Sequence, residues 1–166
     1  MKTLAKQILC LCLSLILVLG LAACGSSGTA SGKKAERLSL DARPDAPSDI
    51  PEGLDIDWNY RYTFAELESQ LSQMAETYPD ITALYSIGCS WLERVLWCLE
   101  ITNKAIPAEE KTGIGVFANI HGGERESASS AMYTAWWLTL CSGDDYVKGL
   151  LDSYIIYIIP VINPDG

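Results

Sequence analysis

The sequence predicts an α/β protein built on a mixed sheet with helices on both faces. Two observations support this fold class. Apolar runs bounded by glycine, proline or polar residues indicate buried strands, and they alternate with segments whose apolar residues recur at helical spacing. The expected order is a helix, three strands, a helix and a further strand, which is typical of a mixed sheet packed against helices.

The first expected helix runs from Phe64 to Tyr78. Thr63 and Glu66 have the spacing of a capping box, in which each side chain binds the backbone amide of the other residue. Apolar side chains then recur every three or four residues, as on the buried face of a helix. Pro79 ends the pattern, because proline cannot continue a helix.

The remaining elements follow from apolar runs and from the breaks between them. A short turn over Cys89–Arg94 separates the first two strands, and a polar loop over Asn103–Thr112 precedes the third. Pro160 indicates a bulge or an edge position near the end of the last strand. We expect strands at 81–87, 95–101, 113–120 and 154–162, and helices at 126–140 and 146–151, all within one domain at 54–166.

The strongest candidate site follows the strand at 113–120. His121, the only histidine, stands before two glycines and Glu124, where a strand passes through a tight turn into a helix. Ligands bind at the carboxyl ends of strands in open α/β sheets, and an imidazole and a carboxylate on one turn can bind a single Zn²⁺ ion. The alternative is a surface ion pair between the two side chains, since His-x-x-Glu is a short pattern.

The first residues indicate export. Lys2 and Lys6 precede an uncharged apolar stretch, as in a secretory signal at residues 1–23. Leu-Ala-Ala before Cys24 resembles the lipobox of bacterial lipoproteins, in which the cysteine becomes a lipid-modified N-terminus. Residues 24–53 then form a flexible tether, poor in large apolar side chains. We expect a lipid anchor on the outer face of the bacterial cytoplasmic membrane; a plain secreted protein is the alternative.

The overall charge excludes one class of partner. The formal net charge is −9, and no basic cluster interrupts the acidity. A polyanion is a poor match for nucleic acid, so we expect no nucleic-acid partner. Peptide-like substrates are compatible with this charge, which does not choose among them.

The motifs in their order resemble the zinc carboxypeptidases of the carboxypeptidase A type. His121 and Glu124 resemble that family's His-x-x-Glu pair, and Asn163-Pro164-Asp165-Gly166 resembles the turn after its next central strand. The segments 62–67 and 86–101 are similar to its opening helix and first hairpin, although Glu93 stands where the hairpin's glycine is usual. The resemblance covers residues 58–166 and implies a carboxypeptidase-like fold.

The same resemblance implies site residues. His121 and Glu124 would be two ligands of Zn²⁺, and the enzyme would remove C-terminal residues from peptides or cleave cell-wall peptides. Some members carry an arginine between the two ligands; here that place is Gly123, so Arg125 is a weak candidate for substrate binding, and a pairing with solvent or with Glu126 is the alternative.

The family's third zinc ligand, a histidine, and its general-base glutamate lie downstream of the Asn-Pro-Asp-Gly turn. The catalytic domain is therefore expected to be incomplete at its C-terminus, and no catalytic residue is assigned within this chain. We expect these 166 residues to bind zinc weakly if at all and not to catalyse. Two alternatives stay open: a zinc amidohydrolase of the aspartoacylase-like type, and a non-catalytic peptide-binding surface lipoprotein.

Overall fold

The computed structural model describes residues 43–45 and 62–166. The predicted signal at 1–23, most of the tether at 24–53 and the start of the domain at 54–61 lie outside the described residues. The described elements are α2 (Phe64–Thr77), β1 (Thr82–Cys89), β2 (Val95–Ile101), the short 3-10 helix η2 (Ala108–Glu110), β3 (Thr112–Phe117), α3 (Arg125–Leu140), α4 (Asp145–Ser153) and β4 (Tyr154–Ile159).

The four strands form one mixed sheet in the order β1-β2-β4-β3. β1 pairs antiparallel with β2, and β2 pairs antiparallel with β4. β3 pairs parallel with β4, which requires the crossover through α3 and α4. The predicted mixed sheet is confirmed, and the strand predicted last in the chain is an inner strand of the sheet.

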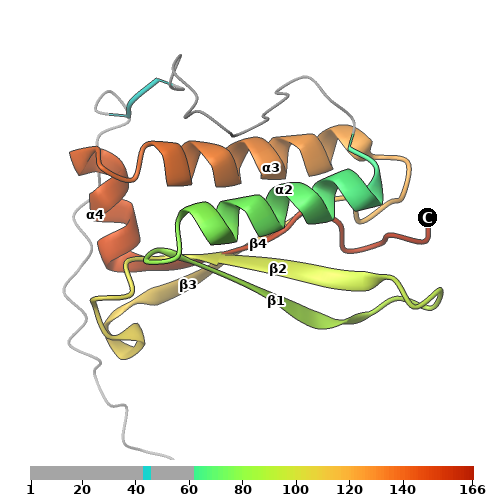
Figure 1. The fold of residues 1–166 in the computed structure, drawn as a ribbon, viewed down its shortest axis with the longest axis horizontal. Helices are drawn as coiled ribbons and strands as arrows, with labels where there is room; N and C mark the ends of the chain where they lie inside the picture. Colours follow the sequence, from blue (N-terminus) through green and yellow to red (C-terminus); the bar gives the residue numbers. More distant parts are fainter. Residues whose placement is uncertain (1–42, 46–61) are drawn as a thin grey trace, which may run out of the picture. The chain divides into compact units, whose positions relative to one another are not determined.

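The α-helices α2, α3 and α4 lie over one face of this sheet (Figure 1). The main core joins α2, α3 and α4 to Leu99 and Ile101 of β2 and to Ile156 and Ile158 of β4, which all point to the same side. The predicted mixed sheet with helices is confirmed, and within the described residues α2, α3 and α4 all pack on the same face. Helical periodicity shows that a helix has a buried side, but it does not say which face of a sheet that side covers.

The start of α2 is as predicted. The Thr63 amide donates to Glu66 Oε2 at 2.8 Å, and the Glu66 amide donates to Thr63 Oγ1 at 3.3 Å, so both halves of the capping box are present. Leu67, Leu71 and Met74 are buried beneath the helix. α2 is thus fixed at its first turn and by its apolar side.

Strands β3 and β4 are shorter than predicted. The apolar run to Ile120 suggested a strand over all of it, but β3 ends at Phe117. Asn119 has a left-handed backbone with φ of 52°, and its amide donates to the side chain of Ser127 rather than to a strand. β4 ends at Ile159, because Pro160 has no amide hydrogen to donate to a neighbour.

The opposite end of the sheet from the β1–β2 turn holds a polar cluster. Asp152 accepts hydrogen bonds from Asn103 Nδ2 at 2.7 Å and from Lys148 Nζ at 2.6 Å. Lys111 Nζ donates to Thr102 Oγ1 at 2.6 Å and to the Leu151 carbonyl at 3.0 Å. These contacts tie the loop after β2 to the end of α4.

Residues 43–45, which the sequence assigns to the tether, contact α3. The Pro44 carbonyl accepts a hydrogen bond from Trp137 Nε1 of α3 at 3.2 Å. Across residues 43–45 and 62–166, none of the helices has both the length and the apolar character that crossing a membrane requires.

Candidate metal-binding site

His121 and Glu124 meet at the carboxyl end of β3. His121 Nδ1 lies 2.8 Å from Glu124 Oε1. Their side chains are 80% and 55% exposed, so both are accessible from solvent. The hydrogen bond with His121 holds the pKa of the Glu124 carboxyl below its ordinary value. Glu124 is therefore a carboxylate at neutral pH, and its oxygen lies close enough to His121 for one cation to contact both.

The backbone places these two side chains on one turn. The Glu124 amide donates to the His121 carbonyl at 2.9 Å, which closes the turn between them. Glu124 occupies the N-cap position of α3, yet its carboxylate makes no capping hydrogen bond and binds His121 instead. Ser127 Oγ donates to the Glu124 carbonyl at 2.6 Å. The residue at the N-cap position thus directs its carboxylate toward His121 instead of capping the helix.

Gly122 is required at its position by a close approach of two backbone segments. A Cβ atom added to Gly122 would overlap the backbone of Gly166, and a Cβ atom added to Gly166 would lie 2.8 Å from the Gly122 Cα. Gly123, by contrast, has open space around it. The turn after β3 therefore packs against the segment after β4 through one of its two glycines.

The donor set fits zinc in kind but supplies only two ligands. An imidazole nitrogen and a carboxylate oxygen are common zinc donors, and catalytic zinc sites use three protein ligands. Within the part of the chain that the structure describes, no group of three His, Cys, Asp or Glu residues could hold a metal ion. Asp165 binds the β1–β2 turn, and Asp144 caps α4, so neither carboxylate completes the site.

Arg125 lies beside a cavity of about 480 Å³ at the same end of the sheet. The cavity is lined by the start of α2, by Arg94, and by Asn119, Gly122 and Asp165. Arg125 is exposed, and its guanidinium forms no hydrogen bond or ion pair with another described residue. The alternative pairing with Glu126 is thus not seen.

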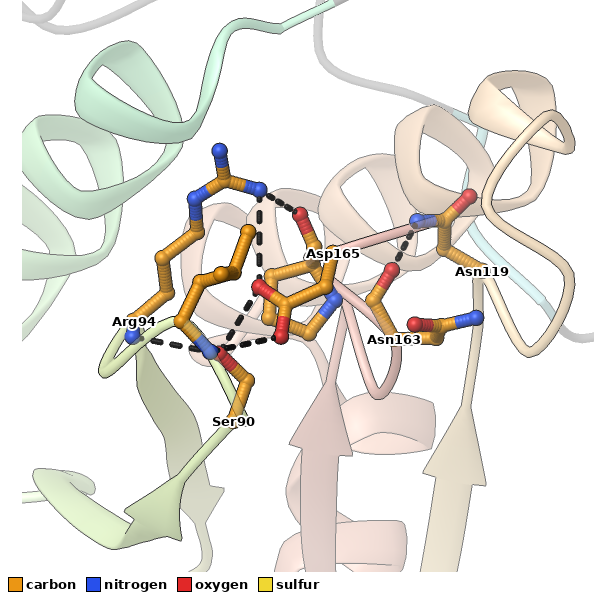
Figure 2. Close-up of polar contacts among 7 residues, drawn as sticks. Ser90, Arg94, Asn119, Asn163 and Asp165 are labelled. Atoms are coloured by element: carbon orange, nitrogen blue, oxygen red, sulfur yellow. Dashed lines mark hydrogen bonds and ion pairs between the residues drawn. The ribbon is translucent and has the colours of Figure 1, made fainter.

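Sequence reasoning missed a polar network on the other side of this cavity. Asp165 accepts hydrogen bonds from Ser90 Oγ at 2.8 Å and from the Leu92 amide at 2.9 Å (Figure 2). Arg94 Nη1 donates to the Pro164 carbonyl and lies 3.5 Å from Asp165 Oδ1. The resemblance singled out both the hairpin and the Asn-Pro-Asp-Gly turn, but no local spacing pairs residues so far apart in the chain.

Comparisons with known proteins show which family this chain is similar to. Residues 67–166, well over half of the chain, match the zinc carboxypeptidase family. Carboxypeptidase E of Caenorhabditis elegans is 34% identical over 119 residues, and a zinc carboxypeptidase of Saccharothrix mutabilis subsp. capreolus is 28% identical over 123 residues. These matches cover 68% and 71% of this chain, and 24% and 26% of the relatives.

A solved structure shows the same fold. The crystal structure of thrombin activatable fibrinolysis inhibitor (TAFI) superposes with a TM-score of 0.60 at 27% sequence identity, covering 65% of this chain and 27% of that chain. The expected carboxypeptidase-like fold is confirmed. The chain spans about a quarter of the length of these proteins, and His121 and Glu124 lie within the matched region.

Proposed function

Because the chain belongs to the zinc carboxypeptidase family, we propose that it carries the metal-binding turn of a zinc-dependent metallocarboxypeptidase. His121 and Glu124 are the proposed zinc ligands. The proposed substrates are peptides, including cell-wall peptides, from which C-terminal residues are removed. The observation that carries this proposal is the 2.8 Å approach of His121 Nδ1 and Glu124 Oε1 at the carboxyl end of β3, inside the matched region.

The chemistry of the two side chains supports these roles. His121 and Glu124 would hold a zinc ion that would lower the pKa of a bound water and polarise the carbonyl to be cleaved. Glu124 keeps its carboxylate free of helix capping, and both side chains face solvent, so a substrate can reach them. The site also requires a general base and at least one further protein ligand, and the described residues hold no group of three that could bind a metal ion.

A zinc titration followed by NMR tests the ligand assignment. His121 is the only histidine, so its imidazole signals report on this site alone. We expect the signals to shift at high zinc concentration, since two protein ligands bind the ion only weakly, and Glu124→Gln to weaken the apparent affinity by at least about tenfold, because a charged ligand is lost. Glu126→Gln is the matched control on the same helix start and should leave the affinity unchanged.

The opposite result would favour another function. Imidazole signals that ignore zinc in the unaltered protein would remove the metal-binding proposal. The non-catalytic peptide-binding alternative would then be the better account of this fold.

We also propose that Arg125 binds an anionic group of the substrate. Its guanidinium has no partner among the described residues and lines the cavity beside Gly122. A peptide with a free C-terminal carboxylate should perturb the Arg125 amide signal, and Arg125→Ala should weaken that binding. Equal binding by the amidated peptide would contradict the role.

The finer proposal for location is a lipid-anchored protein on the outer face of the bacterial cytoplasmic membrane. Its support is the placement of Cys24 directly after a basic start, an apolar stretch and Leu-Ala-Ala. Metabolic labelling with a fatty acid in a bacterial host tests it. The unaltered protein should take up the label, and Cys24→Ser should lose it; a labelled Cys24→Ser protein would contradict the proposal.

A further inference from the structure

We propose that Asp165 is a positioning residue, whose carboxylate clamps the β1–β2 turn to the segment after β4 and thereby holds the His121–Glu124 turn in place. The inference rests on the proposed function, because it concerns the geometry of the proposed metal ligands. It assigns to Asp165 a role that neither the motif nor the ligand pair gives it.

The clamp begins at the Asp165 carboxylate. The side chain is 18% exposed, and both of its oxygens accept hydrogen bonds from the β1–β2 turn, Oδ1 from Ser90 Oγ and Oδ2 from the Leu92 amide. Arg94 reaches the same segment through the Pro164 carbonyl (Figure 2). Hydrogen bonds to a charged group are stronger than neutral ones. One carboxylate thus joins two segments that are more than seventy residues apart.

The turn that Asp165 binds is itself closed. Ser90 and Arg94 are joined by a backbone hydrogen bond of 2.8 Å, and the Arg94 amide donates to Ser90 Oγ at 3.1 Å. Glu93 between them has a left-handed backbone with φ of 60°. Ser90 Oγ therefore accepts from Arg94 and donates to Asp165, and the turn offers Asp165 a preformed set of donors.

The segment after β4 carries this restraint to the proposed site. Asn163 Nδ2 donates to the Ile120 carbonyl at 3.1 Å, and Asn119 Nδ2 donates to the Asn163 carbonyl at 3.3 Å. Ile120 immediately precedes His121, and Gly122 packs against Gly166. The contacts from Asp165 thus extend through neighbouring backbone to the residues on both sides of His121. Figure 2 shows the hydrogen bond between Asn119 and Asn163.

The exposure of the ligands makes such a clamp necessary. Side chains that are 80% and 55% exposed are not held by packing, so their positions depend on the backbone that carries them. Metal ligands bind more tightly when their supporting contacts hold them in place, and loss of such contacts lowers metal affinity by about 10- to 100-fold. Asp165 acts on the ligands through the backbone and does not touch the metal.

Amide hydrogen exchange in the metal-free protein tests the clamp. The Glu124 amide, which donates to the His121 carbonyl, is the reporter of the turn. Asp165→Asn should speed its exchange by about tenfold, the change expected when one charge-assisted hydrogen bond is lost. The matched control is Asp152→Asn, the same change at a carboxylate that binds Asn103 and Lys148 at the other end of the sheet. It should leave Glu124 exchange unchanged.

The outcomes separate the clamp from the metal site. Unchanged Glu124 exchange in Asp165→Asn would overturn the clamp, and so would equal acceleration by Asp152→Asn, which would mean a general loss of stability. Zinc titration then measures the consequence, an expected loss of about tenfold in apparent affinity for Asp165→Asn. If the unaltered protein does not bind zinc while the exchange result holds, the proposed function fails and the clamp stands.

A second variant covers the case in which Asp165→Asn does not fold. Ser90→Ala keeps the carboxylate and removes one of its donors. The same local acceleration at Glu124 is expected, at smaller size, with Ser130→Ala on the exposed side of α3 as the control. Identical Glu124 exchange in the Ser90 variant and the unaltered protein would overturn the proposal.

Discussion

At the scale of single residues, the proposed site depends on a glycine as much as on its ligands. Gly122 and Gly123 stand side by side in the sequence and look equivalent there. Only Gly122 approaches another backbone segment, that of Gly166, whereas a side chain at Gly123 would extend into open space. The distinction arises from a contact between residues that are distant in the chain, so no local pattern reports it.

Alanine at these two positions gives a matched pair of variants. Gly122→Ala should lower the free energy of unfolding by about 1–3 kcal/mol, because the new methyl group forces two backbone segments apart. Gly123→Ala should change it by less than about 0.5 kcal/mol. Urea unfolding followed by circular dichroism measures both. Equal effects of the two substitutions would contradict the close packing of Gly122 on Gly166.

The sequence predicted the ligand pair but not its support. His121 and Glu124 are close in the chain, and a strand, a glycine turn and a helix start are visible around them. Their metal-binding role stays a prediction. The bonds from Ser90 and Leu92 to Asp165 were not predictable, because two separate turns must fold before their donors and acceptors meet. At Glu93 the resemblance implied a glycine, and the left-handed backbone there, with φ of 60°, is a conformation that glycine adopts without strain.

At the scale of helices and strands, local signals predicted most elements. β2 has the predicted bounds, and α2 has the predicted cap. The errors lie where tertiary contacts decide where an element ends. The apolar run extends to Ile120, but β3 ends at Phe117. The strand stops there because Asn119 turns away and its amide binds the side chain of Ser127. Apolar runs show which residues are buried, and they do not show where strand pairing stops.

The cap of α2 provides a prediction at this scale. Thr63→Ala should destabilise the protein by about 0.5–2 kcal/mol, because the helix loses the acceptor for the Glu66 amide. Thr63→Ser keeps a hydroxyl in place and is the control, with a much smaller expected effect. Thermal unfolding of the three proteins compares them directly. A Thr63→Ser protein as unstable as Thr63→Ala would show that the methyl group, and not the cap, carries the stability.

At the scale of the whole described fold, the arrangement of the sheet was not predictable. β4 lies between β2 and β3, so the order of strands in space differs from their order in the chain. The face opposite the helices holds Tyr85, which pairs with Cys98, and Phe117, which pairs with Ile159. Tyr85 and Phe117 are 37% and 58% exposed. Alternating apolar residues predict two faces of a strand without saying which one receives the helices.

The charged groups at the two ends of this sheet have different roles. Those at one end surround the proposed site, and Asp152 at the other end contributes stability that depends on pH. Burial by itself raises the pKa of Asp152, but hydrogen bonds from Lys148 and Asn103 outweigh it, so the pKa lies below the ordinary value of 3.8. The unfolded chain then binds more protons than the folded one. The stability contributed by Asp152 is therefore complete above pH 3.8 and is lost as the pH falls through the lowered pKa of the folded state.

Asp152→Asn tests this sign. At about pH 5 the variant should be less stable than the unaltered protein by about 1 kcal/mol, since the asparagine makes weaker hydrogen bonds with Lys148. As the pH is lowered from there through the lowered pKa of the folded state, the gap should narrow, because the unaltered carboxyl becomes protonated. Urea unfolding at a series of pH values gives the difference. A gap that stays constant across them would mean that the Asp152 carboxylate contributes no charge-dependent stability, and that the tie between α4 and the loop after β2 rests on neutral hydrogen bonds and packing alone.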